Sequence, residues 1–88
     1  MKVVLSKKFV KHRDKLCKAD QKLVSNTLLQ FSKNPFDVTL RNHALKGSLR
    51  GVRSIDVKHD LRILYYEEDD HMYVLLLDVG SHSQLYGG

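Results

Sequence analysis

The sequence predicts an α+β fold in which an N-terminal strand and a two-helix hairpin pack on a small twisted antiparallel sheet. Two observations carry this prediction. Apolar residues recur at helical spacing up to about residue 33, and three apolar runs with short polar connections follow after residue 51. Helices followed by a series of strands are typical of a domain whose helices cover one face of a sheet. At 88 residues, the chain is expected to form a single domain, residues 1–88.

The first half of the chain is expected to hold one short strand and two helices. Residues 2–6 (KVVLS) are typical of a strand, and Ser6 can cap a helix over residues 7–18. The apolar positions of this helix are Phe9, Val10, Leu16 and Cys17. Asp20 can cap a second helix, whose apolar positions are Leu23, Val24, Thr27, Leu28 and Phe31. The short join between the two favours an antiparallel hairpin.

The second half is expected to form the sheet. Asn34 and Pro35 end the helical pattern, because proline lacks an amide hydrogen and disfavours helix in the residue before it. Three strands are predicted over residues 52–57, 61–67 and 72–79. Their short connections favour an antiparallel meander, and the nearly continuous apolar run of the last strand favours a place in its middle. The tail SHSQLYGG should form about one turn.

Charge is distributed unevenly along the chain. Residues 2–33 carry nine Lys or Arg against two acids, and residues 40–62 carry six against two. Residues 63–88 carry five acids and no Lys or Arg. A basic body of this kind indicates a polyanionic partner, either nucleic acid or an acidic protein segment, although a soluble basic domain without such a partner has the same pattern.

Several classes of site are disfavoured by the residues present. The single cysteine, Cys17, excludes an intramolecular disulfide and is expected to be a small buried apolar residue, which favours a reducing, cytoplasmic location. No run approaches the roughly 20 apolar residues of a membrane span. The five histidines are scattered without metal-ligand spacing, so we expect neither a metal nor another cofactor. They are His12, His43, His59, His71 and His82.

Three segments carry a resemblance to a known family. They are NHALKGSLRGVRSIDV (42–57), DLRILYY (60–66) and GSHSQLY (80–86). In this order and at these intervals they resemble the YafQ branch of the RelE/ParE superfamily of bacterial type II toxins. RelE-type members are ribosome-dependent endoribonucleases that cut messenger RNA, and acidic antitoxins neutralise them. The resemblance therefore implies a RelE-like fold, a ribosome and messenger RNA as partners, a cognate acidic antitoxin, and a toxin that is monomeric when free.

The resemblance also assigns the site residues. His43 matches the family's loop histidine, Asp60 its strand aspartate and His82 its C-terminal histidine, which makes these three the catalytic candidates. Cleavage by the RNA's own 2′-hydroxyl needs one group to take a proton and another to give one, which His43 and His82 could share. Asp60 could orient an imidazole or act as the base. The expected substrate-binding residues are Lys46, Arg50, Arg53, Arg62 and Tyr86, the last by stacking on a base.

Two positions depart from the family pattern. Asp56 stands where close relatives often have a second histidine, and Asp78 where several have an arginine. Arg62 or Arg53 could replace the missing arginine. These departures keep two other functions open: a ParE-like poison of DNA gyrase, and a degenerate toxin that binds RNA or antitoxin without cutting.

Overall fold

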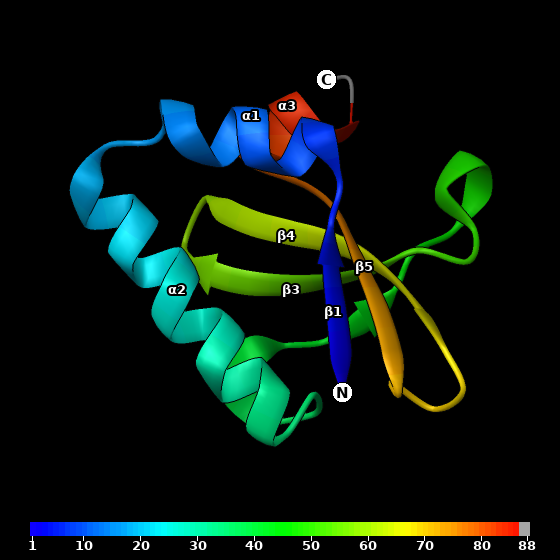
Figure 1. Ribbon diagram of the computed structural model, residues 1–88. Helices are drawn as coiled ribbons and strands as arrows, with labels where there is room; N and C mark the ends of the chain where they lie inside the picture. Colours follow the sequence, from blue (N-terminus) through cyan, green and yellow to red (C-terminus); the bar gives the residue numbers. More distant parts are fainter. Residues whose placement is uncertain (87–88) are drawn as a thin grey trace.

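The computed structural model describes residues 1–86, which form one mixed sheet with two helices packed against it and a third at the end of the chain (Figure 1). In chain order the elements are β1 Lys2–Leu5, α1 Lys7–Lys15, α2 Lys18–Lys33, β2 His43–Ala44, β3 Arg53–Lys58, β4 Leu61–Glu68, β5 Tyr73–Gly80 and α3 His82–Tyr86. Short 3₁₀ turns, Val38–Leu40 and Gly47–Leu49, flank β2. Gly87 and Gly88, the end of the predicted tail, lie outside the described residues.

The sheet has the order β1-β5-β4-β3-β2. The predicted antiparallel meander is confirmed, because β3, β4 and β5 pair antiparallel in sequence order. The sheet as a whole is mixed, since β1 pairs parallel with β5. Both helices and the strands β2, β3 and β4 lie between β1 and β5 in the chain, so no tight turn joins the two and a parallel pairing is possible. β5 is an internal strand, while β4 occupies the middle of the five.

The helices differ from the sequence expectation at their junction. Ser6 caps α1 as predicted, its Oγ accepting from the Phe9 amide at 3.0 Å. However, α1 ends at Lys15, because Leu16 is extended (φ −71°, ψ 153°). Cys17 consequently precedes α2 and is exposed, so the prediction that it is buried is wrong. From this junction the helices diverge at a wide angle across the sheet instead of lying side by side (Figure 1).

Asp20 also has another role than the predicted cap. Since α2 begins at Lys18, Asp20 lies inside its first turn, where a carboxylate interacts favourably with the helix dipole. Its Oδ1 lies 2.8 Å from the Nζ of Lys58 at the end of β3. This ion pair connects the start of α2 to the sheet.

Strand alternation separates a core face of the sheet from an open one. Ile55, Ile63 and Leu76 are fully buried with Phe9 of α1 and Val24 of α2 in one core. Each such side chain contributes about 1.5–3 kcal/mol when fully buried. Successive residues of a strand point to opposite faces, so the neighbours of Ile55 and Ile63 on β3 and β4 point away from the helices. The polar residues of the candidate site lie on that open face.

Candidate active site

A groove of about 550 Å³ lies on the open face of the sheet. Asp56 of β3 and Arg62 of β4 are cross-strand partners and form its floor. His43 of β2 pairs with Ser54, two residues from Asp56 on the same face of β3. The helix α3 adds residues from the C-terminal end. The groove is lined by Arg41, His43, Leu45, Lys46, Leu49, Asp56, Arg62, His82 and Tyr86.

His43 is oriented by the backbone of its own loop. Leu40 is buried in the core, whereas Arg41 adopts a left-handed conformation with φ of 49°. This bend brings the carbonyl oxygen of Arg41 to 2.9 Å from the Nδ1 of His43. A carbonyl can only accept a hydrogen bond, so Nδ1 must carry the hydrogen. In the neutral ring, Nε2 then has the free lone pair that a general base needs.

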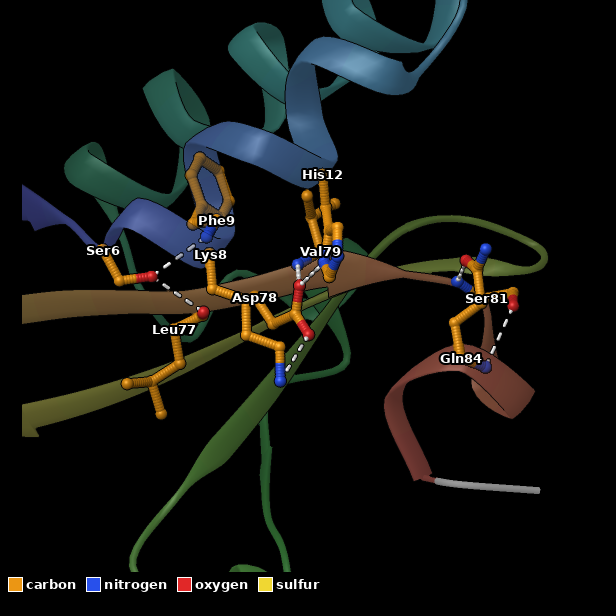
Figure 2. A network of polar contacts seen from close by, with 9 residues as sticks. All are labelled: Ser6, Lys8, Phe9, His12, Leu77, Asp78, Val79, Ser81 and Gln84. Atoms are coloured by element: carbon orange, nitrogen blue, oxygen red, sulfur yellow. Dashed lines mark hydrogen bonds and ion pairs between the residues drawn. The ribbon is translucent and has the colours of Figure 1, made fainter.

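His82 is held by backbone and side-chain contacts at the start of α3. The Gln84 side chain accepts from the Ser81 amide at 2.8 Å, and the Gln84 amide donates to the Ser81 hydroxyl at 3.3 Å (Figure 2). This reciprocal pair is a capping box. The His82 amide donates to Oδ1 of Asp60 at 3.2 Å, and its ring meets Tyr86 edge-on at 4.5 Å. Asp60 therefore contacts the backbone of His82, which corresponds to a positioning role.

The arginines of the groove are held by carboxylates. Asp56 Oδ1 lies 3.3 Å from Nε of Arg62, and its Oδ2 lies 3.7 Å from Nε of Arg41. Arg62 also has Asp60 at 4.0 Å. The aspartate that departs from the family pattern thus fixes two guanidinium groups beside the histidines. Arg41 was not a candidate from the sequence, although it lies two residues before His43.

The structure brings together most of the predicted site residues. Five of them line the groove: His43, Lys46, Arg62, His82 and Tyr86. Asp60 lies beside the groove, where it contacts the backbone amide of His82 and the guanidinium group of Arg62.

Two predicted binding residues do not line the groove. Arg50 is exposed just beyond the turn Gly47–Leu49. Arg53 lies on the core-side face of β3 with Ile55, because the two are two positions apart and side chains alternate between the faces of a strand. Its Nε donates to Oδ1 of Asn42 at 2.8 Å, and its guanidinium lies 5.3 Å from the centroid of the Phe36 ring.

Asp78 lies outside the groove and anchors α1 instead (Figure 2). It is only 7% exposed, and its Oδ1 accepts from His12 Nδ1 at 2.6 Å and from the Val79 amide at 2.8 Å. Lys8 approaches the other oxygen at 3.5 Å. A bulge in β5 opposite Leu64 and Tyr65 allows this orientation. Asp78 therefore has a structural role that an arginine could not fill, because it would face Lys8 and His12.

Neither metal ligands nor a membrane helix are apparent in the described part of the chain. Among residues 1–86, no three His, Cys, Asp or Glu side chains are grouped as a metal ion would require. None of the helices in this range is both long and apolar enough to span a membrane.

The family model for the YafQ toxin, described as a bacterial toxin of a type II toxin–antitoxin system, matches residues 1–87. The chain belongs to the YafQ family. The fold agrees, since YafQ from E. coli superimposes with a TM-score of 0.83 at 21% identity, covering 97% of both chains.

Two further solved structures are similar to this YafQ-family chain. A copper-bound mutant toxin from Helicobacter pylori is 35% identical, with a TM-score of 0.79 over 97% of this chain and 98% of the other. A toxin–antitoxin complex from Mycobacterium tuberculosis contains a chain that is 22% identical, with a TM-score of 0.64 over 92% and 96%. A comparison with curated proteins found no match.

Proposed function

We propose that this YafQ-family toxin is a ribosome-dependent endoribonuclease that cuts messenger RNA by acid–base catalysis without a cofactor. The observation that carries the proposal is the convergence of His43 and His82 on one basic groove, although 39 positions separate them in the sequence. Paired histidines suit this chemistry because a neutral imidazole can accept a proton and a charged one can donate a proton near neutral pH.

The proposed reaction needs only groups of the RNA and of the groove. Nε2 of His43 takes the proton of the 2′-hydroxyl, whose oxygen attacks the adjacent phosphorus. The bond from phosphorus to the 5′-oxygen breaks, and His82 gives that oxygen a proton, which leaves a 2′,3′-cyclic phosphate. Arg62 and Arg41 stabilise the additional negative charge on the phosphoryl oxygens. Asp60 positions His82 through its backbone amide.

Substrate binding is assigned to the walls of the groove. Lys46 and Arg41 would contact backbone phosphates, and Tyr86 would stack on an unpaired base. Arg50, outside the groove, is proposed to contact RNA or ribosome farther along the strand. Arg53 is reassigned from phosphate binding to the interior contacts described below.

The antitoxin is proposed to be an acidic segment that binds the basic face of α1 in the bacterial cytoplasm. The lysines of this face are Lys7, Lys8, Lys11 and Lys15, and Lys18 at the start of α2 adds to them. That the similar protein from Mycobacterium tuberculosis was crystallised as a toxin–antitoxin complex supports an antitoxin as the partner, while the charge of α1 supports the surface.

Histidine substitutions test the catalytic assignment. We expect His82→Ala, and less severely His43→Ala and Asp60→Ala, to lower ribosome-dependent cleavage, since a positioned proton-transfer group contributes about 10²- to 10⁴-fold. His59→Ala is the matched control, because His59 is an exposed histidine of the β3–β4 turn that does not line the groove. Cleavage is measured by mapping messenger 5′ ends after incubation with translating ribosomes, and folding by circular dichroism.

The same assay separates the other functions. A folded His43/Asp60/His82 triple-alanine protein that remains fully toxic would contradict the nuclease mechanism and favour gyrase, which a supercoiling assay then tests. A wild-type protein that binds ribosomes without producing new 5′ ends would be a degenerate toxin. Cleavage should persist in a chelator. Loss of cleavage in the presence of a chelator would show that the reaction needs a metal ion. The test is worthwhile because a similar toxin was crystallised with copper bound.

A further inference from the structure

A polar cluster lies behind the groove, on the core side of the sheet, and the proposed reaction does not use it. It joins β3, β4 and two turns through side chains that touch one another. Its members are Asn42, Arg53, Tyr65, Glu67 and His71. Tyr65 is fully buried and His71 is 7% exposed.

The hydrogen bonds of Asn42 have a single consistent direction. Arg53 is a donor only, so its bond of 2.8 Å fixes the Asn42 atom facing it as Oδ1. The amide nitrogen of Asn42 then donates both of its hydrogens, one to the Pro35 carbonyl at 2.8 Å and one to the Tyr65 hydroxyl at 2.6 Å. All the polar atoms of this side chain are therefore used.

The direction continues from Tyr65 to His71. Because the Tyr65 oxygen accepts from Asn42, its own hydrogen is directed to Nε2 of His71 at 2.8 Å. His71 is thus the acceptor of this bond, and its Nδ1 faces Glu67 at 3.8 Å. Glu67 also accepts from the His71 amide at 2.9 Å. The chain of bonds runs in one direction from Arg53 to His71, so removing one hydroxyl breaks it in the middle.

This cluster holds the loop that orients His43. Asn42 lies between Arg41 and His43, while Leu40 is fixed in the core on the other side of Arg41. Arg41 is therefore anchored by both neighbours in a left-handed conformation that a non-glycine residue rarely adopts. That conformation presents the Arg41 carbonyl to Nδ1 of His43.

We propose that Asn42, Tyr65 and Arg53 are positioning residues that hold His43 in the tautomer with a free Nε2, an inference that rests on the proposed function. If the cluster is broken, Arg41 can relax to a right-handed conformation and its carbonyl leaves His43. The neutral ring then also populates the tautomer with hydrogen on Nε2, which cannot accept the 2′-hydroxyl proton. The tautomer population of His43 therefore depends on a tyrosine on the other face of the sheet.

The test compares Tyr65→Phe with Tyr66→Phe. The two tyrosines are adjacent, but Tyr66 is exposed on the opposite face and its hydroxyl contacts only Glu68, at 3.2 Å, among the described residues. Nitrogen-15 chemical shifts of the His43 ring report the tautomer in the isolated chain without RNA. Single-turnover cleavage at saturating ribosomes reports the chemical step.

In the wild type and in Tyr66→Phe we expect hydrogen on Nδ1 of His43. In Tyr65→Phe we expect a mixture of tautomers and about 10- to 100-fold slower turnover with little change in the substrate concentration for half-maximal rate. Asn42→Ala, which removes the same link from the loop side, should reproduce both effects. A wild-type ring with hydrogen on Nε2, or variants that keep the wild-type tautomer, would overturn the inference. Correct tautomers in a protein that cuts no RNA would instead contradict only the proposed function.

Discussion

Tyr65 shows how one residue can belong to the core and to a polar cluster at once. Its ring packs edge-on against Phe31 at 4.8 Å, while its hydroxyl has two hydrogen-bond partners. A buried tyrosine usually finds such a partner for its hydroxyl, because an unsatisfied one costs free energy. The side chain therefore joins the stability of the core to the position of the loop before His43.

The ionisation of Tyr65 should make the fold sensitive to alkali. Burial raises the pKa of the Tyr65 phenol above its ordinary value of 10.0, against the lowering effects of Asn42 and Arg53. A raised folded-state pKa stabilises the protein below pH 10, and that stabilisation is lost as pH rises through the folded-state value. We expect the free energy of unfolding, measured by denaturant titration between pH 8 and 11, to fall less steeply in Tyr65→Phe than in the wild type.

The raised pKa values of Lys58 and Tyr66 decide which variant is the control for this measurement. A hydrogen bond to Asp20 raises the pKa of Lys58, so some alkaline loss remains in every variant. The charge of Glu68 raises the pKa of Tyr66, but Tyr66 is exposed and its effect is screened by solvent. Tyr66→Phe should therefore follow the wild-type curve. Superimposable curves for the wild type and Tyr65→Phe would show that the buried phenol is not linked to unfolding.

At the scale of elements, α3 depends on its cap. A helix of five residues is too short to be stable alone, so contacts at its first residues determine where His82 lies. Gly80 leaves room for these contacts, since a Cβ there would lie 2.8 Å from Oε1 of Gln84. The capping box and the bond to Asp60 consequently fix a catalytic candidate on the last turn of the chain.

Replacing Gln84 should release α3 without unfolding the sheet. We expect Gln84→Ala to remove about 1 kcal/mol of local helix stability and to lower cleavage, because His82 loses its fixed position. Gln84→Glu should behave like the wild type, since glutamate also completes a capping box. Hydrogen exchange at the Leu85 amide, which donates to the Ser81 carbonyl at 3.0 Å, measures the fraying. Unchanged exchange at the Leu85 amide in Gln84→Ala would show that the capping box does not hold α3.

The elements also show how far the sequence could predict this structure. The meander follows from apolar runs and short connections, which are local signals, whereas β1 pairs with a strand some 70 positions away that no local pattern specifies. No glycine or proline marks the end of α1, so the sequence predicts a helix that continues past Lys15 and a buried Cys17, whereas the helix ends at Lys15 and Cys17 is exposed. Arg53 could have been excluded from the groove, because alternation from Ile55 already puts it on the core face. The pairing of His12 with Asp78 depends on a bulge and had no signal.

The whole molecule carries its charge in two regions with different proposed partners. Lysines of α1 lie on the outside of the molecule, whereas Arg41, Lys46 and Arg62 lie in or beside the groove. The five acids after residue 63 do not neutralise these two regions evenly, because four of them are consecutive at the end of β4 and in the turn that follows, Glu67–Asp70. An acidic antitoxin and an RNA backbone should therefore be attracted to separate surfaces.

Charge reversal on each surface should separate the two partners. We expect Lys11→Glu with Lys15→Glu to slow antitoxin association by about tenfold or more at low salt, because steering of an acidic segment depends on the field of α1. Lys46→Glu should instead weaken ribosome binding and reduce its salt dependence, because a phosphate contact is lost.

Each variant is the control for the other, and Lys8 is left unchanged because it contacts Asp78. Stopped-flow association at several salt concentrations and ribosome co-sedimentation measure the two effects. If the antitoxin associates equally fast at low and high salt, or if both variants impair both partners alike, the charges of α1 and of the groove do not act as separate surfaces.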